Sequence, residues 1–158
     1  MGVLLGALRT GYGLVVMGAD QAADLAAGDH VEFSGFDGEA RDISVSSGAG
    51  QANGLITLEP GIWRMECWLR GFFSGSTGGF EFQFRDNAAS AVFGVGGRLE
   101  PQTGAANQHT VAACHGMEEF LVATEIEVRI LFNSLLTELE ESANFGCRVT
   151  FTRVDDGK

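Results

Sequence analysis

Residues 80–85 read Phe-Glu-Phe-Gln-Phe-Arg, and this stretch decides the fold class. Phenylalanine occupies every second position, and polar or charged side chains fill the positions between. Successive side chains of a β-strand point to opposite faces, so the alternation predicts a strand with one buried and one exposed face. A slip of one residue would expose all three phenylalanines. Burial of each contributes about 1.5–3 kcal/mol, so a firm register is expected.

The same alternation recurs along most of the chain. Apolar residues alternate with polar ones in further stretches, namely 31–34, 43–45, 62–72, 126–132 and 147–152. Shorter strand candidates lie at 55–58, 91–95, 110–113 and 120–123. Strands that each have one apolar face need a second layer to cover that face. The sequence therefore predicts an all-β fold, a two-sheet antiparallel sandwich of about eight to ten strands.

The segments between these strands carry turn signals and little helix. The glycine-rich stretch 75–79 predicts a hairpin connection. Residues 20–27 favour one or two helical turns, with Asp20 as the N-cap and Gly28 as the stop. Two longer segments are expected to lie outside the main strands: 96–108 as a loop, and 133–144 as a loop or a short helix.

The composition describes a single acidic domain. The chain has 158 residues, which fits the ~100–200 residues of one domain. Its 21 acidic residues outnumber 10 basic ones and give a net charge of −11. Such a charge repels phosphate, so it argues against nucleic acid and anionic membranes as partners. Glycine, with 23 residues, is about twice as frequent as the average and indicates many turns.

The three cysteines give no sign of a metal site. Cys67, Cys114 and Cys147 are widely spaced and form no Cys-x-x-Cys motif. All three lie in apolar stretches, so we expect small buried side chains rather than metal ligands. An odd number allows at most one bridge within the chain and leaves one thiol over. No metal and no cofactor is expected.

The N-terminal segment has two interpretations. Residues 1–28 begin with an apolar, glycine-rich stretch that Arg9 interrupts, which argues against a signal peptide or a membrane span. The first interpretation is an extended arm that packs on another chain, followed by a sandwich at 29–154 and a charged tail at 155–158. The second is simply a first strand of the domain. The arm's candidate interface residues are Leu4, Leu5, Leu14, Val15 and Val16.

The titratable residues do not form a recognisable catalytic pattern. Cys114 and His115 are adjacent, so in a strand they point to opposite faces and cannot act as nucleophile and base. The stretch 48–54 has the spacing Gly-x-Gly-x-x-x-Gly and opens no helix, so it is not a dinucleotide fingerprint. The sequence therefore predicts a protein that is not an enzyme.

Two apolar side chains interrupt otherwise polar strand faces. Trp68 lies between Glu66 and Arg70, and Leu131 breaks the polar face of the strand at 126–132. Tryptophan is enriched at the energetic centres of interfaces, so both residues are candidate interface anchors. The alternative is that a loop of the same chain covers Trp68.

Two motifs carry a family resemblance. The run from Leu58 to Cys67, Leu-Glu-Pro-Gly-Ile-Trp-Arg-Met-Glu-Cys, resembles the strand entry of C1q/TNF-like jelly rolls. The run from Ala143 to Val149, Ala-Asn-Phe-Gly-Cys-Arg-Val, is similar to their final strand. The resemblance covers roughly residues 29–154. It implies a compact jelly roll that assembles as a homotrimer and works through its surfaces rather than through chemistry.

The resemblance also implies a place for such a protein. Small glycine-rich jelly rolls of this length look like bacteriophage head decoration (cement) proteins. By this analogy the chain is a structural virion protein on the capsid surface, where it binds and stabilises neighbouring major capsid subunits. An alternative is the carbohydrate- or receptor-binding head of a phage fibre, with Trp68 stacking on sugars. A small sandwich or cupin-like enzyme is the third possibility.

Overall fold

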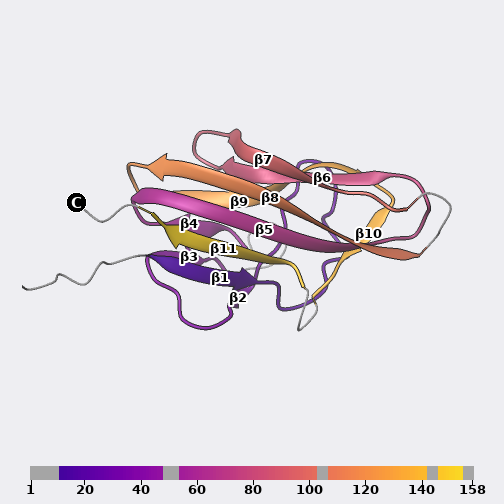
Figure 1. Ribbon diagram of the computed structural model, residues 1–158, viewed down its shortest axis with the longest axis horizontal. Helices are drawn as coiled ribbons and strands as arrows, with labels where there is room; N and C mark the ends of the chain where they lie inside the picture. Colours follow the sequence, from indigo (N-terminus) through magenta and orange to yellow (C-terminus); the bar gives the residue numbers. More distant parts are fainter. Residues whose placement is uncertain (1–10, 48–53, 103–106, 142–145, 155–158) are drawn as a thin grey trace, which may run out of the picture.

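The computed structural model describes residues 11–47, 54–102, 107–141 and 146–154, and these residues form strands, turns and loops without any helix (Figure 1). The strands are β1 (Tyr12–Val16), β2 (Gly35–Phe36), β3 (Ile43–Val45), β4 (Ile56–Leu58), β5 (Gly61–Phe73), β6 (Gly79–Asp86), β7 (Ala91–Leu99), β8 (Gln108–Phe120), β9 (Thr124–Ser134), β10 (Leu136–Leu139) and β11 (Arg148–Arg153). All strand pairs are antiparallel.

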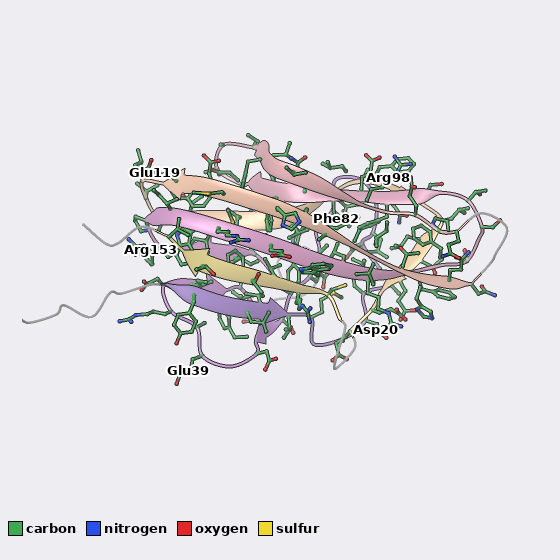
Figure 2. All side chains as sticks on the ribbon, viewed as in Figure 1. Asp20, Glu39, Phe82, Arg98, Glu119 and Arg153 are labelled. Atoms are coloured by element: carbon green, nitrogen blue, oxygen red, sulfur yellow. The ribbon has the colours of Figure 1, made fainter. Side chains whose placement is uncertain are left out.

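The strands form two layers around one apolar core. One layer has the order β2-β1-β11-β5-β8, and β10 pairs with β5 beyond the end of β11. The other layer has the order β3-β4-β9-β6-β7. Phe80, Phe82 and Phe84 all point into the core and are fully buried, and Figure 2 places Phe82 near the middle of the molecule. The predicted all-β antiparallel sandwich and the register of residues 80–85 are therefore confirmed.

The two layers are hydrogen-bonded to each other at one side, through β7. A bulge at residues 94–96 of β7 shifts its register with β6, and within this bulge Val95 pairs with His115 of β8. The Gln83 amide donates to two backbone carbonyls of the bulge, at 3.2 and 2.8 Å. Gly94 adopts φ +75°, and a Cβ there would lie 2.2 Å from the His115 carbonyl oxygen. Only glycine fits at this junction.

Four of the alternating stretches form the predicted strands. Residues 62–72 lie in β5, 80–85 form β6, 126–132 lie in β9 and 147–152 form most of β11. A fifth alternating stretch, 43–45, forms β3, and the short candidate 55–58 contains β4. The alternating pattern predicts these strands correctly because each of them is buried on one face and polar on the other.

The helical prediction for residues 20–27 is wrong. Asp24 has φ +52°, which no right-handed helix contains. The Gln21 side chain instead organises the segment, because its amide nitrogen donates to the carbonyls of Ala23, Asp24 and His30. Its amide oxygen accepts from the Glu32 backbone nitrogen at 2.9 Å. These side-chain bonds replace the backbone bonds of a helix.

Several connections also differ from the prediction. Residues 75–79 do not form a hairpin, because β5 and β6 lie in different layers and the chain crosses between them. Of residues 120–123, Phe120 ends β8 and 121–123 form the turn to β9, where Leu121 is exposed. Residues 31–34 form no strand, although Val31 and Phe33 are fully buried. Part of each expected loop is strand: 96–99 belong to β7 and 136–139 form β10.

The described part of the N-terminal segment belongs to the sandwich. β1 pairs with β11 over five residues, from Tyr12 opposite Thr152 to Val16 opposite Arg148. The first interpretation, an extended arm over residues 1–28, is therefore wrong for residues 12–16. These residues form a first strand of the domain, as in the second interpretation. Residues 1–10 and the charged tail at 155–158 lie outside the described residues.

Candidate interaction surface

The outer face of the β1-β11-β5-β8 layer is the most distinctive surface of the molecule. Strand register puts outward-facing side chains in rows across this layer, for example Val16, Arg148, Trp68 and Ala113. We call it the β5–β8 face, and it comprises Leu14, Val16, Arg64, Glu66, Trp68, Arg70, Val111, Ala113, His115, Met117, Arg148 and Thr150. β5 and β8 are its longest strands and run side by side along the molecule (Figure 1).

Large apolar side chains are exposed on this face. Met117 is 65% exposed, Val111 is 56% exposed and Trp68 is 38% exposed. Val95 projects at the side of the face, opposite His115, and is 68% exposed. A cluster of this kind on a monomeric surface marks an interaction site more often than a scatter of single apolar residues does.

Trp68 is held in place by a neighbour on its own strand. Its indole nitrogen donates to the Glu66 carboxylate at 2.7 Å. Glu66 lies opposite His115 on β8, while Trp68 lies opposite Ala113. The small Ala113 leaves one side of the indole without a bulky cross-strand neighbour. The ring is therefore oriented before any partner arrives, which lowers the entropy lost on binding.

The face is positively charged on a strongly negative molecule. It carries three arginines, Arg64, Arg70 and Arg148. In the rows from Arg64 to Arg70, the outward-facing acidic residue is Glu66. Arg70 forms an ion pair with Glu140 at 2.8 Å. Among the described residues, no ion pair joins Arg64 or Arg148 to a carboxylate. These two guanidinium groups remain free to meet acidic groups of a partner.

The far end of the face is closed by an interaction network. The Glu140 carboxylate contacts both Arg70 and His109, the latter at 2.7 Å from Nδ1. The His109 ring lies 5.1 Å from the Phe72 ring. Glu140 also donates its backbone nitrogen to the Arg70 carbonyl at 3.0 Å. The network fixes the strand ends around Arg70, while the rows from Arg64 to Trp68 and the side chain of Val111 stay open.

Comparison with solved structures identifies the architecture. An Eiger TNF from S. frugiperda aligns over 94% of this chain and 95% of its own, with a TM-score of 0.67 and 6% sequence identity. Murine APRIL aligns over 92% of this chain and 100% of its own, with a TM-score of 0.59 and 12% identity. The fold is the TNF/C1q-like jelly roll.

The globular domain of a zebrafish complement 1qA protein agrees with this assignment. It covers 90% of the chain and 94% of its own, with a TM-score of 0.54 and 10% identity. No family model and no curated protein matches the sequence. At these identities the likeness concerns the TNF/C1q-like fold itself. The predicted C1q/TNF-like jelly roll is therefore confirmed.

The predicted interface residues lie in different parts of the jelly roll. Leu14, Val16 and Trp68 lie together on the β5–β8 face. Val15 is fully buried in the core, because β1 is part of the layer, so it is not available to a partner. Leu131 is 41% exposed on β9, in the opposite layer. Leu4 and Leu5 lie outside the described residues.

Two contributors to the face were missed from the sequence. Val111 and Met117 both lie on β8, of which the pattern predicted only the short stretch 110–113. Their exposure follows from strand register, because each stands opposite an outward-facing arginine of β5. Only the pairing partner of β8 could have revealed them, and the alternation within one strand does not identify that partner.

The titratable groups are dispersed over the jelly roll. Cys114 is buried and His115 is exposed, so they do point to opposite faces as predicted. Glu127 is buried and contacts Arg85 and Arg129 at 3.0 Å and His30 at 3.5 Å. Within the described ranges, no three His, Cys, Asp or Glu residues could hold a metal ion together. The same part of the chain contains no helix able to span a membrane.

Proposed function

We propose that this chain is a non-enzymatic structural protein that assembles as a homotrimer through the β5–β8 face and decorates a virus capsid. The observation that carries the assembly is the face itself, where exposed apolar side chains and two unpaired arginines lie on one layer of a protein with net charge −11. Aromatic and arginine side chains are enriched at the centres of protein interfaces.

A second copy of the chain supplies complementary surfaces. The β8–β9 hairpin carries Glu118 and Glu119 before its exposed tip, and Figure 2 places Glu119 at one end of the molecule. The β7 edge exposes Val92, which is 46% exposed. An acidic, apolar edge matches a basic, apolar face in both charge and hydrophobicity. Contact between two different surfaces of identical chains gives a ring when the rotation between neighbours closes, and a trimer is such a ring.

The place on a capsid rests on sequence resemblance. Small glycine-rich jelly rolls of this length resemble decoration proteins of bacteriophage heads, and this supports a virion location with the major capsid protein as partner. A trimer would leave the outer face of the β3-β4-β9-β6 layer free, with Leu131 on it. That layer is the surface we assign to contact with the capsid.

Trp68 supports a second candidate, the carbohydrate-binding head of a phage fibre. Its indole is exposed and oriented by Glu66, as stacking on a sugar requires. The two candidates use the same residue differently. In a trimer Trp68 becomes buried between copies, whereas in a sugar-binding head it stays open to solvent.

The experiment compares Trp68→Arg with Leu131→Arg by sedimentation velocity and native mass spectrometry. The two residues are 38% and 41% exposed, on opposite layers, so they form a matched pair. We expect wild type and Leu131→Arg to be trimers. Trp68→Arg should weaken association by about 30-fold or more, since loss of an interface hot spot costs about 2 kcal/mol or more. A monomeric wild type at all concentrations would refute the assembly.

The capsid role is tested separately. Purified protein is mixed with capsids that lack it, and binding is measured by co-sedimentation. We expect wild type to bind and Leu131→Arg to bind less. Failure of the trimeric wild type to bind any such capsid, together with binding on a glycan array that Trp68→Ala abolishes, would favour the fibre head.

A further inference from the structure

Two cysteines lie directly opposite each other on the two longest strands. The register between β5 and β8 pairs Cys67 with Cys114. Directly opposite residues of an antiparallel pair point to the same side of the sheet, here into the core, where both cysteines are fully buried. Their Cα atoms are therefore separated by about 4.5–5.5 Å, as in any such pair. A disulfide requires about 4.4–6.8 Å.

The two thiols also influence each other. Cys114 is one of the groups that raise the pKa of the Cys67 thiol. Both are free thiols in the structure. Bond formation thus needs no change of strand register.

The third cysteine is placed differently. Val149 of β11 lies opposite Cys67, so Cys147 stands two residues further along, diagonal to Cys67. Diagonal positions are about 7–8 Å apart between Cα atoms, which is too far for a disulfide without backbone movement. The Cys147 sulfur is engaged by the backbone of Arg70, at 3.3 Å to the nitrogen and 3.4 Å to the oxygen.

We infer that Cys67 and Cys114 form a disulfide across β5 and β8 when the protein folds in the presence of a small-molecule disulfide, and that Cys147 remains a thiol. One thiolate attacks the small disulfide and releases one thiol, leaving a mixed disulfide on the protein. The second protein thiolate attacks that mixed disulfide and releases the second thiol. Two protein thiols are oxidised and one small disulfide is reduced to two thiols.

The timing follows from burial. Desolvation in the core raises the pKa of the Cys67 thiol well above its usual range. Because the thiolate is the reacting species, the closed, reduced protein reacts slowly. During folding both thiols are still exposed to solvent. The bond therefore forms before the second layer covers the pair, and it then closes the loop between residues 67 and 114.

The test is refolding of the reduced, denatured chain with and without oxidised glutathione. Free thiols are counted by alkylation in denaturant, and bridges are mapped by mass spectrometry of nonreduced peptides. We expect one free thiol per chain, at Cys147, and a Cys67–Cys114 peptide. Relative to the reduced protein, Tm should rise by about 5–15 °C. Native reduced protein in the same buffer should be oxidised at least about tenfold more slowly.

Two variants keep the test decisive. Cys147→Ala should still form the bridge and leave no free thiol, whereas Cys114→Ala should form no bridge within the chain. If Cys114→Ala does not fold, the disulfide map of the wild-type protein and the thiol count of Cys147→Ala still test the inference. Three free thiols after oxidative refolding, or a mapped bridge that includes Cys147, would overturn the inference. Neither outcome depends on whether the protein is a trimer.

Discussion

Substitution of Gly94 by alanine tests how the two layers are joined. Gly94 lies in the β7 bulge with φ +75°, and an added Cβ would lie 2.2 Å from the His115 carbonyl oxygen and 2.8 Å from the Gly116 Cα. Both contacts are with the backbone of β8, so no side-chain rotation relieves them. Alanine at this position must therefore push β7 away from β8 and weaken the pairing of Val95 with His115.

The cost has two parts. An L-residue in the left-handed region costs about 1–2 kcal/mol relative to glycine. Overpacking against a fixed backbone adds about 1–3 kcal/mol. We expect the free energy of unfolding to fall by about 2–5 kcal/mol, and Tm to fall by about 5–15 °C for a domain of this size.

Urea unfolding followed by tryptophan fluorescence and circular dichroism measures the change. Gly35→Ala is the control, because a Cβ at Gly35 meets nothing within 4 Å. It should change stability by less than about 0.5 kcal/mol. Equal stability of Gly94→Ala and wild type would show that β7 does not approach β8 closely, and the account of the junction would be wrong.

Three further predictions concern polar groups. Gln83→Ala should cost about 1 kcal/mol in urea unfolding, because two bulge carbonyls lose their donor, and no effect would contradict the role assigned to that amide. Glu127→Ala should cost about 1.5–3 kcal/mol, since its buried carboxylate contacts Arg85 and Arg129, whereas Glu81→Ala, which removes an exposed partner of Arg98, should cost less than about 1 kcal/mol. Equal losses would contradict the difference in burial. Burial raises the pKa of Cys147 from 9.0 to about 12, so the folded state keeps a proton that the unfolded chain loses above pH 9. Stability should then fall between pH 9 and 12 by up to about 1.4 kcal/mol per pH unit for this thiol, and Cys147→Ala should lessen the slope measured by urea unfolding. An unchanged slope would contradict the burial of this thiol.

Strands with one buried and one solvated face could be predicted from the sequence. Phe80, Phe82 and Phe84 specify β6 and its inward face, and Trp63 to Leu69 do the same for β5. The period of two is a property of each strand alone, so neighbours are not needed to detect it. Trp68 of the candidate face was found by the same logic, whereas Leu14 and Val16 were predicted as residues of an apolar N-terminal arm.

Other features depend on contacts distant in sequence. Residues 75–79 have a hairpin's composition, but the partners of β5 are β8, β10 and β11, and local glycine content does not specify partners. The alanine-rich segment 20–27 favours a helix locally, yet the Gln21 amide reaches His30 and Glu32 and holds an irregular path. Val111 and Met117 became part of the face only through their register with β5.

The two edge strands at the ends of the strand order, β2 and β3, are unusually short. β2 has two residues and β3 has three, and the chain between them spans residues 37–42. Tyr12 and Arg41 exchange backbone hydrogen bonds of 3.2 and 2.8 Å within this corner. These two edges therefore offer little unpaired backbone on which a foreign strand could be templated. Fibril growth by strand addition is not expected to start at β2 or β3, because each is too short to hold an added strand.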